Sequence, residues 1–562
     1  MKPLPRQTPA IRMSLFTIAL ASLPVHNATA FEIDTPRDWK VRWDNTLQYN
    51  LGWRAKNMDS RIANDPTRAE SDHKFPDRGD VVTNRVALLS EFDVVFQDDY
   101  GARISGSGWH DYAYDDDAKS KSGYPSNYDE RKYSSYTKRY YIGGGQLLDA
   151  FVFGNFDLAG RPASLKLGRL NQYWGNSLFF GVLGVSYSQS GSDQIKAVTS
   201  PGTQAKELAL PRGQVNFSYQ ITDELSLGAQ YFYQYEPNRM PEGGTFLGAV
   251  DFLFDGPDKF AAAGGLSRHH ANRPDDNNGN FGLMVRWEPD WLQAAVSIYY
   301  RKLDETQAWG PILGREGATP FYRLSYATDV TLYGVSFDKQ IGEYSIGAEM
   351  SYRENTALNG NNMQVVASDL DATKGPRGDT LNVVLNAVKT LGSTPLYDTG
   401  SLAAELGYVQ RLRTTHYASR YKGVDTQACD ASVASVGLSS GGHKTGCSTD
   451  EAVMLAVNFE PQWLQVLPNL DLSAPMFLMY GVAGNGASVG MPVYERDANF
   501  SIGLKGIFAK RYNATFQYNG YAGRSVGTAR SPIDGSLYNA SGNNLYGLED
   551  RAWWSLAFST TF

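Results

Sequence analysis

The sequence has no long apolar run after Ala30, and this absence excludes a bundle of membrane-spanning helices. A membrane helix needs about 18 or more consecutive apolar residues, whereas polar side chains interrupt every apolar stretch in the rest of this 562-residue chain. Cysteine is nearly missing, with only Cys429 and Cys447, so a disulfide-built framework is excluded. The chain also has no net positive charge, because its 52 Lys and Arg residues are outnumbered by 59 Asp and Glu residues. This balance argues against nucleic acid as a partner.

Residues 1–30 read as a secretory signal peptide. Basic residues precede the apolar stretch "MSLFTIALASLP" (13–24), which is too short to span a bilayer, and the small residues Ala28-Thr29-Ala30 form a cleavage site. We expect cleavage after Ala30, which leaves residues 31–562 as a single domain. In an exported chain, Cys429 and Cys447 are expected to form a disulfide that staples a polar loop; free thiols and a metal site are the alternatives.

A period of two in hydrophobicity is present from the first mature segment. In "WKVRWDNTLQYNLGWRA" (39–55), aromatic and aliphatic residues alternate with charged and polar ones. The polar face is too charged for the core of a sandwich, but the strand suits lipid on one side and water on the other. Similar alternation recurs along the chain at Leu225 to Tyr235, Phe281 to Trp287, Leu292 to Tyr300, Tyr344 to Tyr352, Leu381 to Ala387, Leu402 to Tyr408, Val453 to Phe459, Ala498 to Phe508 and Tyr512 to Tyr518.

The connections between these strands alternate in length. Tight turns such as "ITDE" (221–224) and "EPDW" (288–291) join strands in pairs, and long polar stretches separate the pairs. Short periplasmic turns and long extracellular loops are typical of outer-membrane barrels. The sequence therefore predicts an all-β, transmembrane antiparallel barrel of 16–18 strands. Eighteen is the preferred count, and sixteen stays open because residues 101–114 and 469–480 alternate less cleanly.

The chain ends on an alternating strand, "RAWWSLAFSTTF". This strand must pair with the first one, because open sheet edges are not tolerated in lipid. Its apolar residues also look like the signal that barrel-assembly machinery reads: Trp554, Leu556, Phe558 and Phe562. We therefore expect a protein of the outer membrane of a Gram-negative bacterium, in contact with lipid and lipopolysaccharide.

Several stretches resemble one family. They include "DVVTNRVALLSEFDVVFQDDYGARISGSGWHDYAYDD", "LKLGRLNQYWGNS" and "ELALPRGQVNFSYQITDELSLGAQYFYQYEPNRMPEGGTF". Together with the first strand they are similar to the proteobacterial outer-membrane proteins of domain of unknown function 1302. The resemblance implies one barrel that moves poorly soluble organic compounds. It also implies two possible partners, a periplasmic lipoprotein-carrier-like protein and an inner-membrane transporter of the resistance–nodulation–division type, but it transfers no catalytic residue.

A barrel of this size leaves an aqueous lumen unless loops enter it. Only residues 31–38 separate the expected cleavage site from the first strand, so any plug is expected to be an infolded loop. The candidates are 175–212 and 236–278, which carry the apolar patches "SLFFGVLGVSYS" and "FLGAVDFLF". The alternative is that these patches cover each other outside the membrane.

Charged residues of both signs are expected to line the lumen and to set its selectivity. The candidates are Lys40, Arg42, Arg54, Arg85, Glu91, Asp93, Lys166, Arg169, Arg286, Glu349, Arg353 and Glu405. Mixed charge of this kind can bind the carboxylate of an otherwise apolar solute. The alternative is that the groups are paired and only complete the wall.

No cofactor is expected. Asp276, Asn278 and Asn280 place oxygen ligands at every second residue and form a weak calcium candidate, but the distal glutamate of a calcium loop is missing. No enzyme activity is expected either, because His110-Asp111 and His269-His270 do not lie beside a nucleophilic serine motif and neighbours on a strand face opposite ways.

The sequence thus predicts an outer-membrane channel that passes small organic molecules through a loop-constricted lumen. The alternative is a closed barrel that moves hydrophobic molecules, such as lipids or terpenoid- or steroid-like compounds, together with the two partners that the resemblance implies.

Overall fold

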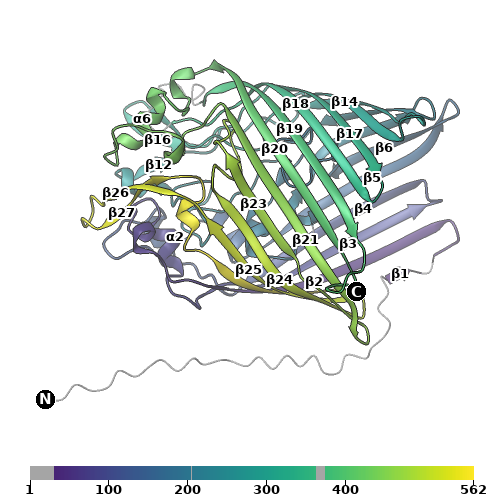
Figure 1. Cartoon of the computed structure of the whole chain (residues 1–562), viewed down its shortest axis with the longest axis horizontal. Coiled ribbons are helices and arrows are strands. Elements are labelled where there is room, and N and C mark those ends of the chain that lie inside the picture. Colours follow the sequence, from purple (N-terminus) through teal and green to yellow (C-terminus); the bar gives the residue numbers. More distant parts are fainter. Residues whose placement is uncertain (1–30, 34, 204, 362–373) are drawn as a thin grey trace.

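The computed structural model describes residues 31–33, 35–203, 205–361 and 374–562. The expected signal peptide lies outside the described residues. Most of the described strands form one closed antiparallel barrel, with tight turns at one end and long connections at the other (Figure 1). No helix among the described residues has the length and apolar character needed to span a membrane.

The barrel strands lie side by side in chain order. They are β2 (Trp39–Arg54), β3 (Val81–Phe96), β4 (Tyr100–Asp111), β5 (Gly143–Leu158), β6 (Arg161–Leu170), β9 (Arg212–Gln220), β10 (Leu225–Phe232), β13 (Phe281–Trp287), β14 (Ala294–Leu303), β17 (Val330–Ile341), β18 (Tyr344–Ala357), β19 (Arg377–Leu391), β20 (Thr399–His416), β21 (Glu451–Leu467), β22 (Leu470–Ser473), β23 (Met476–Ala483), β24 (Ala498–Phe508), β25 (Tyr512–Ala522) and β28 (Trp553–Thr561). The short β1 (Phe31–Ile33) adds to the edge of β2.

The preferred count of eighteen strands is confirmed for the described residues. The sheet has 20 strands in all, but β1 is an addition to β2, and β22 and β23 are two pieces of one barrel strand, since both pair with β21 and with β24. Ala474 and Pro475 interrupt this strand. The interruption explains why residues 469–480 alternate poorly.

The last strand closes the barrel against the first. β28 pairs with β2 from Thr561 opposite Thr46 to Trp553 opposite Arg54. β1 then continues along the same edge of β2 beyond Phe562, which exchanges two backbone hydrogen bonds with Asn45. Both sheet edges are thereby removed, as the pattern of the terminal strand predicted.

Side chains alternate between the two faces of the wall. On β18, Met350 is 47% exposed on the outside, whereas Glu349 and Ser351 are buried on the inside. The outer belt is apolar around the whole barrel, because strand alternation sends one set of side chains toward lipid. Exposed members of the belt are Leu47, Leu88, Ile104, Val152, Leu165, Leu227, Leu283, Ile298, Tyr333, Leu385, Leu406, Leu478, Ile502, Phe516 and Leu556.

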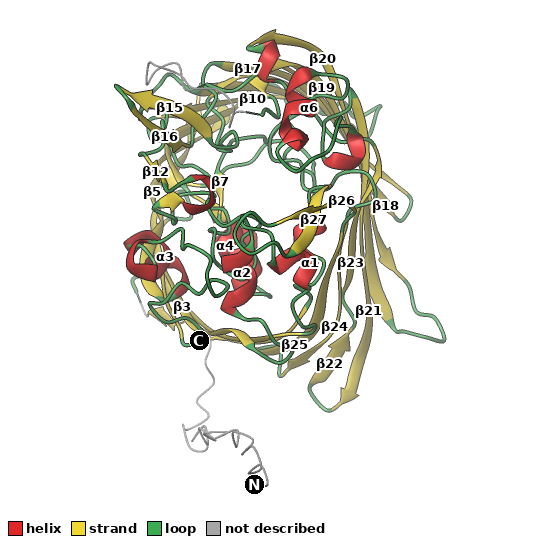
Figure 2. Cartoon of the chain, turned by 90° about the vertical axis from the view of Figure 1, so that its left-hand side faces the viewer, coloured by secondary structure: helices red, strands yellow, loops and turns green. Residues whose placement is uncertain are grey.

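The long connections carry short elements that lie at, and partly within, the extracellular mouth. Figure 2 looks into that end and shows α2 and α4 inside the ring of strands. The helices are α1 (Ser60–Ala63), α2 (Ala69–Lys74), α3 (Ser135–Tyr141), α4 (Gln194–Thr199), α5 (Ala205–Leu208) and α6 (Gln427–Ala434), with 3-10 turns η1 (Asp129–Arg131), η2 (Ala261–Ala263), η4 (Ala418–Arg420), η5 (His443–Thr445) and η6 (Tyr546–Leu548). Short strands pair as β7 (Gly191–Ser192) with β8 (Ala209–Leu210), β26 (Ser525–Arg530) with β27 (Leu537–Gly542), and β11 (Lys259–Phe260), β12 (Leu266–Arg268), β16 (Thr319–Arg323) and β15 (Ile312–Glu316) in one sheet.

Candidate functional site

Residues 171–190, here named the constriction segment, run from β6 into the lumen and contact the inner face of the opposite wall. Their contacts lie on β14, β18, β19 and β20, which are distant from β6 in the sequence. This confirms that the connection 175–212 is infolded.

Two carboxylates of the wall hold the constriction segment by its backbone N–H groups. Glu405 accepts from the N–H groups of Phe179 and Phe180, with N–O distances of 2.9 and 2.5 Å, and also from that of Leu178. Glu349 accepts from Val185 at 2.8 Å and from Ser177 at 2.8 Å. A segment without regular structure needs such partners, because buried N–H groups left without an acceptor are costly.

Guanidinium groups of the wall hold the carbonyl groups of the same segment. Arg301 on β14 donates to the carbonyl oxygens of Val185 and Tyr187 at 2.7 and 2.6 Å. Arg353 on β18 donates to Gly184 at 3.1 Å. Carboxylates of the wall thus bind the backbone N–H groups of the segment, and guanidinium groups of the wall bind its carbonyl groups.

The apolar side chains of the constriction segment pack against an apolar area of the inner wall. Phe180 and Leu183 are almost fully buried in a cluster with Val384, Val409 and Met454. The apolar residues in "SLFFGVLGV" therefore pack against the wall of the barrel and not merely against one another.

The second predicted plug, residues 236–278, also enters the barrel. Phe246 and Leu247 pack with Trp109 of β4 and Trp553 of β28, whose side chains face inward. Arg551 donates to the carbonyl oxygen of Phe246 at 3.0 Å. The expectation of infolding is therefore met for both connections.

α2 joins this second plug through a pair of buried carboxyl groups. Asp251 accepts hydrogen bonds from the backbone N–H groups of Glu70 and Ser71, at 2.7 and 2.9 Å. Burial, together with the nearby Glu70 carboxyl, raises the pKa of Asp251 to about 7. Burial raises the pKa of Glu70 as well. The two groups lie in the extracellular connections, outside the spanning strands.

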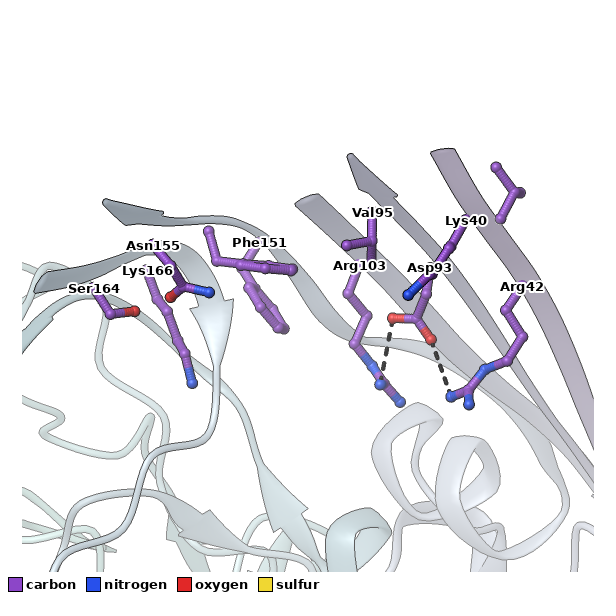
Figure 3. A pocket seen from close by; sticks show the side chains of 11 residues that line it. Lys40, Arg42, Asp93, Val95, Arg103, Phe151, Asn155, Ser164 and Lys166 are labelled. Atoms are coloured by element: carbon purple, nitrogen blue, oxygen red, sulfur yellow. Dashed lines mark hydrogen bonds and ion pairs between the residues drawn. The ribbon is translucent and has the colours of Figure 1, made fainter. Parts of the chain in front are cut away.

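Below the constriction segment, toward the short turns, the wall encloses a cavity of about 860 Å³. We name it the first cavity; Figure 3 shows that Phe151 lies between a cluster of charged groups around Asp93 and a polar group formed by Lys166, Asn155 and Ser164. A second cavity of about 440 Å³ is lined by Trp174, Met284 and Tyr299 among others, and it shares Ser164 and Lys166 with the first. The full lining of the first cavity is Lys40, Val41, Arg42, Asp93, Val95, Arg103, Phe151, Phe153, Asn155, Ser164 and Lys166.

The cations of the first cavity differ in how far they are neutralised. Arg103 makes ion pairs with Glu91, Asp93 and Asp149. Arg42 pairs with Asp44 at 2.9 Å and with Asp93 at 3.5 Å. Lys40 pairs with Asp98.

Lys166 has no ion pair among the described residues. Its Nζ donates to Gln172 Oε1 at 3.4 Å, a long and weak contact. Its ammonium is therefore the cation of the first cavity with the least compensation.

The twelve predicted lumen residues fall into three groups. Lys40, Arg42, Asp93 and Lys166 line the first cavity, and Arg286 lines the second, where it pairs with Glu288 and Asp338. Glu91 is buried against Arg103, and Arg169 pairs with Glu236 of the connection that follows β10. Their proposed part in selectivity stays a prediction.

The remaining five need a correction: Arg54, Arg85, Glu349, Arg353 and Glu405. Strand parity places them on the inner face correctly, but each is at most 3% exposed because the infolded connections cover it. Arg54, for example, pairs with Asp72 of α2 and with Asp550. These five side chains hold the connections and do not line an aqueous passage.

Seven residues of the first cavity were not foreseen from the sequence: Val41, Val95, Arg103, Phe151, Phe153, Asn155 and Ser164. Arg103 is opposite Asp93 in the ladder and opposite Phe151 on its other side, and Phe153 is opposite Lys166. Parity along β4 identifies Arg103 as inward-facing. For Phe151 and Phe153, the hydrophobicity pattern is misleading, because an aromatic residue on alternate positions normally indicates the lipid face.

The predicted disulfide is present, with an S–S distance of 2.02 Å between Cys429 and Cys447. The calcium candidates are engaged with protein: Asp276 accepts from the backbone N–H of Tyr235, and the amides of Asn278 and Asn280 donate to Asp304. No group of three or more acidic, His or Cys side chains suited to a metal occurs in the described ranges.

The two residues of the His110-Asp111 pair have separate surroundings. His110 is exposed with its ring against Tyr112, whereas the buried Asp111 accepts from Thr83. G-x-S-x-G patterns occur at 437–441 and 486–490, and both lie in extracellular loops rather than in the strand–turn–helix context of a hydrolase.

The chain is similar to one family model and to several solved structures. Among solved structures, Acinetobacter baumannii OccAB4 is 10% identical with a TM-score of 0.41, over 94% of this chain and 99% of that chain. Pseudomonas aeruginosa OccD3 (OpdP) is 11% identical with a TM-score of 0.39, over 92% of this chain and 91% of that chain. The outer membrane channel DcaP of Acinetobacter baumannii is 11% identical with a TM-score of 0.34, over 94% of this chain and 99% of that chain.

No curated protein sequence matches this chain. A family model described as "Protein of unknown function (DUF1302)" matches residues 11–562. The match covers the whole barrel, from the first strand to the terminal strand, and agrees with the resemblance seen in the sequence. The protein therefore belongs to the DUF1302 family.

Proposed function

We propose that the protein is an outer-membrane channel through which small organic molecules diffuse. The observation that carries the proposal is the pair of adjoining cavities beneath the constriction segment, lined by charged and aromatic side chains. A closed barrel of eighteen strands is wide enough for an aqueous lumen. The constriction segment narrows that lumen and leaves room next to β5, β6 and β10.

The contacts of the constriction segment support a fixed rather than a collapsing narrowing. Charge-assisted hydrogen bonds are among the stronger ones in proteins, and Glu349, Glu405, Arg301 and Arg353 supply several of them. A solute would pass between this fixed segment and the wall of β5 and β6. Lumen charges of both signs would favour polar or ionised solutes over neutral apolar ones.

The test is single-channel recording of the purified full chain in a planar bilayer, after heat-modifiable migration on a gel has shown that the barrel is folded. A steady, ohmic current supports the channel. Ion selectivity that shifts in Lys166→Gln and stays constant in Lys505→Gln would connect the current to the cavities, since Lys505 faces inward on β24 but lines neither cavity. A folded protein that remains silent would overturn the proposal.

One observation favours the second candidate, a closed conduit for hydrophobic molecules. Val384, Val409 and Met454 form an apolar area of the inner wall. This area would be exposed to the lumen if Phe180 and Leu183 moved away. In this case the protein would act with a periplasmic carrier and an inner-membrane transporter, as the family resemblance implied. A silent bilayer together with a lipid or terpenoid co-purifying with the protein would support this candidate over the channel.

A further inference from the structure

We infer that the first cavity is a binding site for organic monoanions that carry an aromatic ring, with Lys166 as the anchor for the carboxylate. The inference rests on the proposed channel function and names the class of solute that the lumen selects. Lys166, Phe151 and Phe153 are the residues that form the site, and they come from the adjacent strands β5 and β6.

The charge of the site points to an anion. The other cations of the first cavity are already compensated: Arg103 by three carboxylates, Arg42 by two and Lys40 by one. A carboxylate that approached Arg42 or Arg103 would meet these acidic groups and be repelled. Lys166 has no acidic partner in the described part of the chain and only a long contact with Gln172, so a carboxylate that binds there gains a charge-assisted interaction without displacing a native ion pair.

The apolar part of the site points to a ring. Phe151 and Phe153 face the lumen on alternate positions of β5, with their ring centroids 6.4 Å apart and tilted by 47°. Phenylalanine side chains that face a water-filled lumen are unfavourably exposed to water unless something apolar covers them. An aromatic ring placed on them would bury this area and gain ring–ring contacts worth about 0.5–1.5 kcal/mol beyond burial.

The two features lie at the right relative position. Phe153 is directly opposite Lys166 in the β5–β6 ladder, and directly opposed residues on a sheet have their Cβ atoms about 4.5–5.5 Å apart. A benzoate-sized molecule can therefore place its ring on the phenylalanines while its carboxylate contacts the ammonium. The polar side chains of Asn155 and Ser164 line the same end of the cavity.

The position of Lys166 also suits passage rather than permanent capture. It lines both cavities, so an anion can pass from the second cavity, with Trp174 and Tyr299, to the first without losing contact with the ammonium. Conduction needs a site that is favourable enough to enter and weak enough to leave. One lysine, and not an arginine pair, meets that need.

The test measures binding directly, so that it does not depend on conductance. Sodium benzoate is titrated into the detergent-solubilised full chain by calorimetry, with sodium acetate and benzyl alcohol as probes that lack the ring and the charge. We expect benzoate to bind more tightly than either probe. Lys166→Gln should weaken benzoate at least about tenfold, the loss expected for one charge-assisted contact, and Lys505→Gln should leave it unchanged.

A second variant tests the ring. Phe151→Leu keeps an apolar side chain of similar size, and we expect it to weaken benzoate while acetate is unaffected. The inference is overturned if benzoate binds equally well to Lys166→Gln and to the unaltered protein, or if acetate binds as tightly as benzoate. Benzoate binding without conductance would support the binding site and refute the channel. Conductance without benzoate binding would support the channel and refute the binding site.

Discussion

The carboxylate of Glu405, on β20 of the wall, accepts a hydrogen bond from the backbone N–H of Phe180 in the constriction segment, with an N–O distance of 2.5 Å. The two residues are 225 positions apart in the sequence. The bond therefore fixes a loop from one side of the lumen to a strand on the other, and it is one of the contacts that keep the narrowing in place.

Replacement of Glu405 by alanine should loosen the constriction segment. Three backbone N–H groups lose their acceptor, and hydrogen bonds to a charged group contribute about 1.5–3 kcal/mol each. We expect larger and noisier single-channel currents with the barrel still folded. Glu224→Ala, in an exposed periplasmic turn, is the matched control. Currents of unchanged size and noise in Glu405→Ala would show that the segment is held by its apolar packing alone.

Removal of the disulfide should affect a loop and not the barrel. Cys429 and Cys447 are both fully buried and lie in the extracellular connection between β20 and β21. In Cys429→Ser we expect Cys447 to react with a maleimide, because the loop loses a constraint worth about 2–4 kcal/mol. The melting of the barrel, followed by gel mobility, should be unchanged. An unreactive Cys447 in the variant would contradict this expectation.

Deletion of Trp554–Phe562 should abolish insertion into the outer membrane. The deletion exposes the edges of β2 and β25 together, and unpaired backbone groups in lipid cost several kcal/mol each. The measurement is outer-membrane fractionation followed by heat-modifiable gel migration. Shortening the extracellular hairpin of β26 and β27 is the control, since this hairpin forms a separate two-stranded sheet. Correct insertion of the truncated chain would refute the role of the terminal strand.

The docking of the second plug on α2 should weaken as pH rises. Burial holds the pKa of Asp251 at about 7 in the docked loops, against 3.8 for an unperturbed carboxyl, so docking takes up a proton. The stabilisation is complete below about pH 4 and is lost as pH rises through about 7. We expect faster limited proteolysis of residues 236–278 at pH 8 than at pH 5.

Asp251→Asn removes the titrating group and should flatten this dependence on pH. Asp430→Asn is the control, because Asp430 also accepts a hydrogen bond from a loop N–H, that of Gly441, but lies near the disulfide and away from α2. An equally steep dependence in Asp251→Asn would assign the effect to other groups.

Much of the architecture could be predicted from the sequence because each spanning strand obeys a local rule. Alternation along β2 and β18 identified the inner and outer faces residue by residue, and alternation of turn lengths gave the strand count. Both depend on neighbours within one strand or one turn. The prolines and breaks near residues 469–480 weakened the pattern without changing the count, since β22 and β23 keep the same two neighbours.

The candidate site could be predicted only in part, because cover by a distant loop has no local signal. Glu349 and Lys166 are both charged, and strand alternation places both on the inner face of the wall. Glu349 is nevertheless buried under the constriction segment, whereas Lys166 lines two cavities. The apolar patch in residues 177–185 did indicate that something infolds. It did not indicate which part of the wall would receive it.

The pairing of β2 with β28 has a consequence for the order of folding. Trp53 and Trp554 are ladder partners, so almost the entire polypeptide separates the two strands that must meet. Loop-closure entropy makes such a contact slow to form. The seam between them is therefore expected to close last, and until then the edge of β2 stays open to unwanted pairing.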